Sequence, residues 1–182
     1  MHMRRIAFAG VVAALYASMT IVIAPAAYGP IQFRLAEVLC ILPFFFPSTA
    51  LGLFVGCLIA NLMSPYGLLD IVAGSSASLI AGLVTMRLGR INKDAALIKA
   101  VACFPPVIIN ALFIGAVIAW STTSGGDEFR LAFVTYSFQV GLGQFAVMYA
   151  IGLPLLIYFP KTHLFKLLFA QYDLSEVASK IT

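Results

Sequence analysis

The stretch that decides the fold is IAFAGVVAALYASMTIVIA, residues 6–24, in which no side chain is charged. A helix of about 20 mainly apolar residues spans the hydrocarbon core of a bilayer. The basic pair Arg4-Arg5 in front of it is also typical of a secretory signal, but a cleaved signal has a shorter apolar core of about 7–15 residues. We therefore expect residues 6–24 to form a retained membrane-spanning helix.

The composition extends this prediction to the whole chain. Hydrophobic residues make up 62% of the 182 residues and charged residues only 10%, whereas a soluble domain has about 25% charged residues. The net charge of +4 does not indicate nucleic-acid binding, because the basic residues lie in the connections between apolar runs. The sequence predicts an all-α integral membrane protein that forms one domain over residues 1–182.

Five further apolar runs follow the first. The predicted spans are residues 6–24, 35–46, 48–63, 68–88, 97–120 and 131–159, which together give a compact bundle of six transmembrane helices. The second span is short, so we expect it to be kinked or tilted, and Pro105-Pro106 predicts a kink within the fifth. Residues 160–182 are expected either to lie as an amphipathic segment on the inner membrane surface or to extend the sixth helix into the cytoplasm.

The distribution of Lys and Arg predicts the orientation of the bundle. With both termini in the cytoplasm, only Arg34 and Arg130 lie outside. The other basic residues are then inside: Arg4, Arg5, Arg87, Arg90, Lys93, Lys99, Lys161, Lys166 and Lys180. Basic residues favour the cytoplasmic side of a membrane. Most polar residues of the apolar segments then lie toward the outer face, which indicates an outward-facing pocket.

Arg34 and Glu37 stand at the entrance to the second span, where a charge is energetically costly. Charged residues within spanning segments generally mark a substrate or ion pathway. Their spacing of three residues places them on one helical face if the helix has already begun at Arg34. Arg34 alone is also compatible with an interfacial anchor that extends its charge to the headgroups.

No catalytic constellation is present in the sequence, so we expect no enzyme activity, metal or cofactor. The chain lacks the G-x-x-x-x-G-K-[ST] loop that binds ATP phosphates. Cys40, Cys57 and Cys103 lack metal-ligand spacing and are expected to be buried thiols.

Isolated polar residues within the apolar helices are candidates for ligand binding, but an interhelical hydrogen bond is an equally good explanation for any one amide. Asp70 is favoured as functional, although an acidic residue in a first turn also stabilises the helix dipole. These candidates, with the aromatic residues beside them, are Asn61, Asp70, Asn110, Gln139, Gln144, Tyr66 and Tyr136.

A stripe of small residues in the first span, Ala9, Ala13 and Ala17, recurs every four residues. Such a stripe lets another helix approach closely. The spacing does not distinguish packing inside the bundle from docking on a partner subunit.

Two motifs resemble the QueT family of substrate-binding subunits (S components) of energy-coupling factor transporters. They are Q-F-R-x-x-E at residues 32–37 and N-x-x-S-P-Y-G-x-x-D at residues 61–70. The resemblance covers essentially the whole chain. It implies a receptor for a queuosine precursor, the 7-aminomethyl or 7-cyano form of 7-deazaguanine or queuine itself. It also implies a membrane scaffold subunit and two cytoplasmic ATPases as partners, with docking through an A-x-x-x-A motif that Ala9, Ala13 and Ala17 match. The S component binds substrate from outside and then topples in the membrane to release it inside.

The chemistry of a deazaguanine suggests roles for the candidate residues. Glu37 is the first choice to accept the N1–H and the exocyclic amine in bidentate fashion, and Asp70 suits the cationic aminomethyl arm. Arg34 orients Glu37 or contacts O6. The amides of Asn61, Asn110, Gln139 and Gln144 are candidates for the remaining polar atoms, and Phe33, Tyr66 and Tyr136 for stacking on the ring.

Three other classes of function stay open from the sequence. An S component for another vitamin or nucleobase has the same architecture. A stand-alone secondary transporter often shows inverted repeats and midplane coupling groups, and neither is evident in the chain. A structural membrane protein binds no small molecule.

Overall fold

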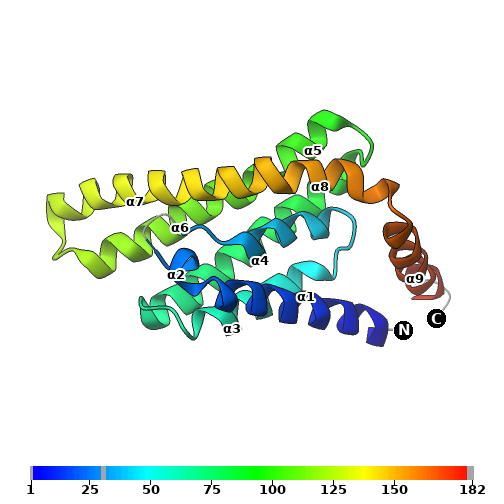
Figure 1. Ribbon diagram of the computed structural model, residues 1–182, viewed down its shortest axis with the longest axis horizontal. Helices are drawn as coiled ribbons and strands as arrows, with labels where there is room; N and C mark the ends of the chain where they lie inside the picture. Colours follow the sequence, from blue (N-terminus) through cyan, green and yellow to red (C-terminus); the bar gives the residue numbers. More distant parts are fainter. Residues whose placement is uncertain (1, 30–31, 180–182) are drawn as a thin grey trace.

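A computed structural model of the chain describes residues 2–29 and 32–179, and every regular element within them is helical. The elements in chain order are α1 (His2–Val22), α2 (Ala24–Ala27), η1 (Leu35–Phe44), α3 (Thr49–Asn61), α4 (Gly67–Ile91), α5 (Ala96–Ala102), α6 (Phe104–Thr122), α7 (Gly126–Val147), η2 (Met148–Gly152), α8 (Leu153–Tyr158), η3 (Phe159–Lys161) and α9 (His163–Ser179). The long helices run along one another, and α9 crosses the end of the bundle where α1 begins (Figure 1). The prediction of an all-α fold is confirmed.

Four described stretches are long and apolar enough to cross a membrane: Met3–Val22, Gly67–Ile91, Ala96–Thr122 and Gly126–Lys161. They correspond to the predicted first, fourth, fifth and sixth spans. The second and third correspond to the shorter apolar helices Leu35–Phe44 and Thr49–Asn61. The chain is therefore a multi-pass membrane protein, while the count of six crossings and the cytoplasmic placement of both termini stay predictions.

Element η1 differs most from an ordinary span because it is a 3₁₀ helix of ten residues. At about 2 Å per residue it is about 20 Å long, which is shorter than the roughly 30 Å hydrocarbon core. It packs against α1, α3 and α4 and is largely buried among them. Since 3₁₀ runs beyond three or four residues are uncommon, the conformation of η1 distinguishes the segment that carries Glu37 from the other spans.

The proline pair of the predicted fifth span begins a helix instead of bending one. Helix α5 ends at Ala102, and α6 starts at Phe104 with Pro105 and Pro106 in its first turn. Prolines are well tolerated there because the first N–H groups of a helix have no partner in any case. The interruption therefore lies at Cys103, just before the prolines.

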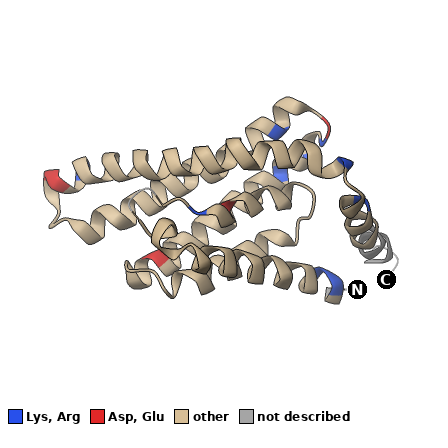
Figure 2. Cartoon of the chain, viewed as in Figure 1, with Lys and Arg blue, Asp and Glu red and all other residues tan. Residues whose placement is uncertain are grey.

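The end of the chain does not continue the sixth span as one straight helix. The backbone turns at Thr162, which is extended, and α9 then leaves at an angle to α8 (Figure 1). The rings of Phe165 and Phe169 pack against Phe46. Most Lys and Arg residues gather at this end of the bundle (Figure 2), as the charge distribution of the sequence predicts for the cytoplasmic side.

Glycine allows α3 to lie directly on α1. A Cβ added at Gly56 would stand 2.7 Å from the carbonyl oxygen of Ala13 and 2.8 Å from the Cβ of Tyr16. Both distances are shorter than any normal contact, so only glycine permits this helix separation. Close approach of this kind through small residues is how membrane helices gain packing energy.

We expect Gly56→Ala to lower the free energy of unfolding by about 1–3 kcal/mol, because the added methyl group forces α1 and α3 apart. Gly10→Ala is the matched control, since a Cβ there meets nothing within 4 Å. That control should leave stability unchanged or slightly raised. Thermal unfolding of the two variants in detergent checks the difference, and equal stabilities would contradict the packing explanation.

Candidate functional site

Glu37 lies in the first turn of η1 with 1% of its surface exposed. Its Oε1 accepts a hydrogen bond from the Tyr16 hydroxyl of α1. Its Oε2 accepts from Asn110 Nδ2 of α6 and from Cys40 Sγ, each at 3.1 Å. Three separate elements thus direct donors at one carboxylate, which is the arrangement that stabilises a buried negative charge.

Arg34 does not share a helical face with Glu37. It precedes η1 in an extended conformation, with φ −96° and ψ 100°. Its Nη2 lies 3.3 Å from Asp70 Oδ2 of α4, and its Nε donates to the carbonyl of Ala27 at 3.1 Å. Its guanidinium carbon lies 5.3 Å from the centre of the Tyr28 ring. Arg34 is therefore fixed by Asp70 and by the segment before η1.

The ion pair between Arg34 and Asp70 is buried, with 4% and 0% of the two side chains exposed. Ser64 Oγ also donates to Asp70 Oδ2, at 2.5 Å. Asp70 Oδ1 has no hydrogen-bond partner among the described residues. Because Arg34 balances only one of the two carboxylates, the site carries a net charge of −1 when both are ionised.

A small cavity adjoins Glu37. Its volume is about 10 Å³, which is about the room that one water molecule needs. It is lined by Gln32, Arg34, Glu37, Asn110, Ile114, Val140 and Gln144. The segment before η1, together with η1, α6 and α7, thus closes around a largely filled space.

The two glutamine amides at this cavity have atoms without a hydrogen-bond partner among the described residues, whereas Asn110 donates to Glu37. Neither side-chain atom of Gln32 has a hydrogen-bond partner among them, and nor does Oε1 of Gln144. Gln32 is 2% exposed and has a positive φ of 51°. A buried amide without a partner is unfavourable, and a positive φ is strained for this residue type. Both features concentrate at functional sites.

The other predicted residues lie at different distances from the cavity. Asn61 donates to the Asp70 carbonyl at 2.8 Å, and its Oδ1 has no partner among the described residues. Tyr66 and Tyr136 do not line the cavity, but they pack against the apolar cluster that contains its lining residues Ile114 and Val140. Gln139 and Phe33 do not line the cavity, and Phe33 is 40% exposed.

Sequence reasoning missed Tyr16, Gln32 and Ser64. Tyr16 is the one tyrosine in the apolar run of residues 6–24, and Gln32 opens the Q-F-R-x-x-E motif, so each residue could have been singled out from the sequence. Ser64 had a signal of the same kind as Gln32, because it is the serine of the N-x-x-S-P-Y-G-x-x-D motif.

The alanine stripe of α1 has a partner inside the chain. Ala13 and Ala17 are buried, Ala9 is half-buried, and the backbone of Ala9 and Ala13 lies against Gly52 and Gly56 of α3. Docking of these alanines on another subunit stays a prediction. The small residues that α1 leaves exposed are Ala7, Gly10, Ala14 and Ser18.

Charged and amide groups enclosed by apolar membrane helices are typical of one class of protein, the polytopic membrane protein with a substrate or ion pathway through its bundle. The sequence model of the family described as "QueT transporter" matches residues 6–161. Since this is most of the chain, the chain belongs to the QueT transporter family.

A curated relative, the "Queuosine precursor transporter QueT" of Lactococcus lactis subsp. cremoris (strain MG1363), is 35% identical over 72 residues. That match covers 38% of this chain and 42% of the relative, which is less than half of its length. No solved structure matches the chain at a significant level.

Proposed function

We propose that the chain is the S component of an energy-coupling factor importer and captures a 7-deazaguanine queuosine precursor. Membership of the QueT transporter family supports this, as does the substrate class in the name of its L. lactis relative. The observation that carries the proposal is the closed, net-negative site around Glu37, in which buried amides lack partners. A polar ligand satisfies such groups.

The two oxygens of Glu37 suit one edge of the base. A deazaguanine presents its N1–H and exocyclic amine side by side, and a carboxylate accepts both. Asn110 and Cys40 occupy Oε2 without ligand, so ligand donors replace one of them. Gln32 and Gln144 line the same cavity, and we expect them to bind O6 or the pyrrole N–H.

The charge of the site favours a ligand with a cationic arm. An aminomethyl group is protonated at neutral pH and balances the excess carboxylate. Asp70 Oδ1 has no hydrogen-bond partner among the described residues and could accept one from this arm. However, Asp70 does not line the cavity, and its Oδ2 is paired with Arg34. We therefore propose that Asp70 positions Arg34, and that Arg34 contacts O6 of the base.

Binding requires the site to open. A two-ring base is many times larger than a cavity of about 10 Å³. Gln32, from the segment before η1, and Gln144, from α7, therefore move apart to admit it. We expect the rings of Phe33, which is 40% exposed, and of Tyr66 and Tyr136, which pack against the apolar cluster beside the cavity, to approach the ligand when the site opens.

Transport also requires partners. The chain has no phosphate-binding loop, so we assign ATP hydrolysis to two separate ATPases and docking to a membrane scaffold subunit. Ala9, with the exposed neighbours Gly10 and Ala14, is the accessible part of the predicted docking stripe. Toppling of the subunit in the membrane delivers the substrate inward.

Titration of the purified chain tests the binding step. We expect one 7-aminomethyl-7-deazaguanine per chain, and guanine, which lacks the cationic arm, to bind about tenfold more weakly or worse. A panel of vitamins and nucleobases distinguishes another S component, because a tighter vitamin ligand would replace the deazaguanine assignment.

Uptake into vesicles tests the energy source. The purified chain alone in the membrane should take up no deazaguanine under an ion gradient, and uptake should begin when the scaffold subunit, both ATPases and ATP are supplied. Uptake by the chain alone would show a secondary transporter instead.

A further inference from the structure

A groove of about 390 Å³ lies between α1 and α9, at the end of the bundle where basic residues gather (Figures 1 and 2). None of the residues that line it lines the cavity at Glu37. The proposed capture of a deazaguanine therefore leaves this groove without a role.

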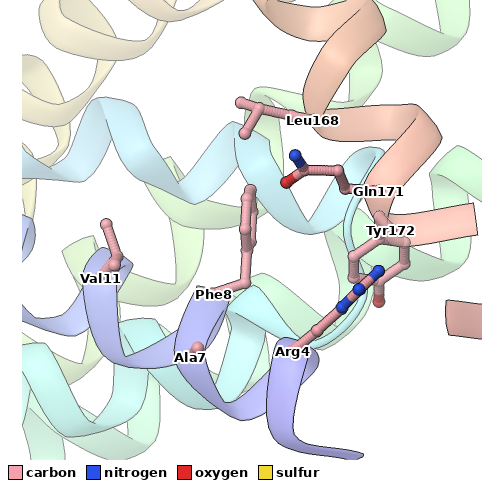
Figure 3. A pocket seen from close by; sticks show the side chains of 7 residues that line it. All are labelled: Arg4, Ala7, Phe8, Val11, Leu168, Gln171 and Tyr172. Atoms are coloured by element: carbon pink, nitrogen blue, oxygen red, sulfur yellow. The ribbon is translucent and has the colours of Figure 1, made fainter. Parts of the chain in front are cut away.

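The groove changes from polar to apolar along its length. Arg4 and Gln171 lie toward one end, Val11 lies at the other, and Phe8 and Leu168 stand between them (Figure 3). Arg4 and Val11 are seven residues apart on one helix, which is about 10 Å along its axis. A ligand that follows this groove is therefore charged at one end and a hydrocarbon at the other.

Specific contacts fix the two walls of the groove. The Tyr172 hydroxyl accepts a hydrogen bond from the backbone N–H of Ser48 at 3.2 Å, and its ring lies edge-on to Phe8 with centroids 6.2 Å apart. Tyr172 is 8% exposed. Because this residue ties α9 to the bundle, the groove is part of the folded structure and does not depend on the ligand.

The positive charge of Arg4 at the polar end indicates that the ligand carries a negative charge there. Arg4 is exposed and forms no ion pair or hydrogen bond with the side chains that the structure describes, those of residues 3–29 and 32–172. Each basic residue near the cytoplasmic surface attracts acidic lipids by about 1 kcal/mol, and basic pockets between membrane helices bind their headgroups. Leu164 and Leu167 of α9 are 58% and 51% exposed, which suits a helix whose outer face lies in lipid.

We propose that this groove binds an acidic glycerophospholipid of the cytoplasmic leaflet. The headgroup phosphate lies against the Arg4 guanidinium and accepts a hydrogen bond from the Gln171 amide. One acyl chain follows Val11 and Leu168 toward the middle of the membrane. The bound lipid then contacts both α1 and α9.

Native mass spectrometry of the purified protein tests this site without any transport assay. The probes are phosphatidylglycerol and phosphatidylcholine with the same acyl chains. We expect phosphatidylglycerol to bind about fivefold more tightly, the effect of about 1 kcal/mol. Arg4→Gln should reduce its affinity to that of phosphatidylcholine. Arg130→Gln, which removes an exposed arginine from a different part of the chain, should leave it unchanged.

A second variant tests the apolar half of the groove. Ala7 lines it from α1 and is exposed, so Ala7→Trp should fill the groove and weaken phosphatidylglycerol binding without altering the charge. Equal affinity for the two lipids, or phosphatidylglycerol binding that survives both Arg4→Gln and Ala7→Trp, would overturn the proposal. Either result would leave the groove to another occupant, such as a protein helix.

Discussion

Glu37→Gln should lower the affinity of the purified protein for 7-aminomethyl-7-deazaguanine by about 30- to 150-fold. The change keeps the size of the side chain, and Tyr16 still has an oxygen to which it can donate. The ligand loses a charged acceptor for two of its donors and meets an amide N–H₂ in place of one oxygen. Hydrogen bonds to charged groups contribute about 1.5–3 kcal/mol each, and the expected loss is about 2–3 kcal/mol.

Isothermal titration of matched variants measures this effect. Glu128→Gln is the control, because Glu128 is an exposed carboxylate in the first turn of α7 and its loss changes the net charge equally. It should bind the ligand as the unaltered protein does. If Glu37→Gln also bound with unchanged affinity, Glu37 would not be the residue that recognises the base.

Arg34→Met should lower the free energy of unfolding by about 3–5 kcal/mol. Among the described residues, Arg34 is the cation that forms an ion pair with Asp70. Its removal leaves the Asp70 carboxylate buried, with Ser64 as the remaining side-chain donor. Breaking one side of a buried ion pair has an effect of this size because an uncompensated charge stays in a low-dielectric interior.

The double variant Arg34→Met with Asp70→Asn separates charge from packing. It should regain more than half of the lost stability, since no unpaired charge remains. Arg130→Met is the control for loss of a cation, because the pair of Arg130 with Asp127 is exposed and 3.8 Å long, and no measurable change is expected. A double variant no more stable than Arg34→Met would show that the guanidinium acts through packing.

The fold was predictable from the sequence because apolar runs have a length that the bilayer sets. Each predicted span matches a helix or a short series of helices, and the ends differ by a few residues. The 3₁₀ geometry of η1 was not predictable, since the apolar pattern of residues 35–46 is equally typical of an α-helix. The sequence predicted a kink at Pro105-Pro106, whereas the helix is interrupted at Cys103. The difference arises because prolines can begin a helix as well as bend one.

The residue types of the site were predictable, but their pairing was not. Glu37, Arg34 and Asp70 attract attention because a charge in a membrane segment needs a reason. That Arg34 pairs with Asp70 depends on how η1 and α4 pack, over a separation of 36 residues. The contact of Tyr16 with Glu37 depends likewise on α1 lying beside η1. Such pairings come from tertiary packing, which cannot be read from the pattern of residues along a single sequence.

The most direct measurement is the mass of the small molecule that stays bound when the protein is purified from cells that make queuosine precursors. We expect a 7-deazaguanine, with the aminomethyl form dominant, in the unaltered protein and in Glu128→Gln, and none in Glu37→Gln. A different vitamin or nucleobase in the unaltered protein would contradict the proposed substrate. A deazaguanine retained equally by Glu37→Gln would contradict recognition of the base by Glu37.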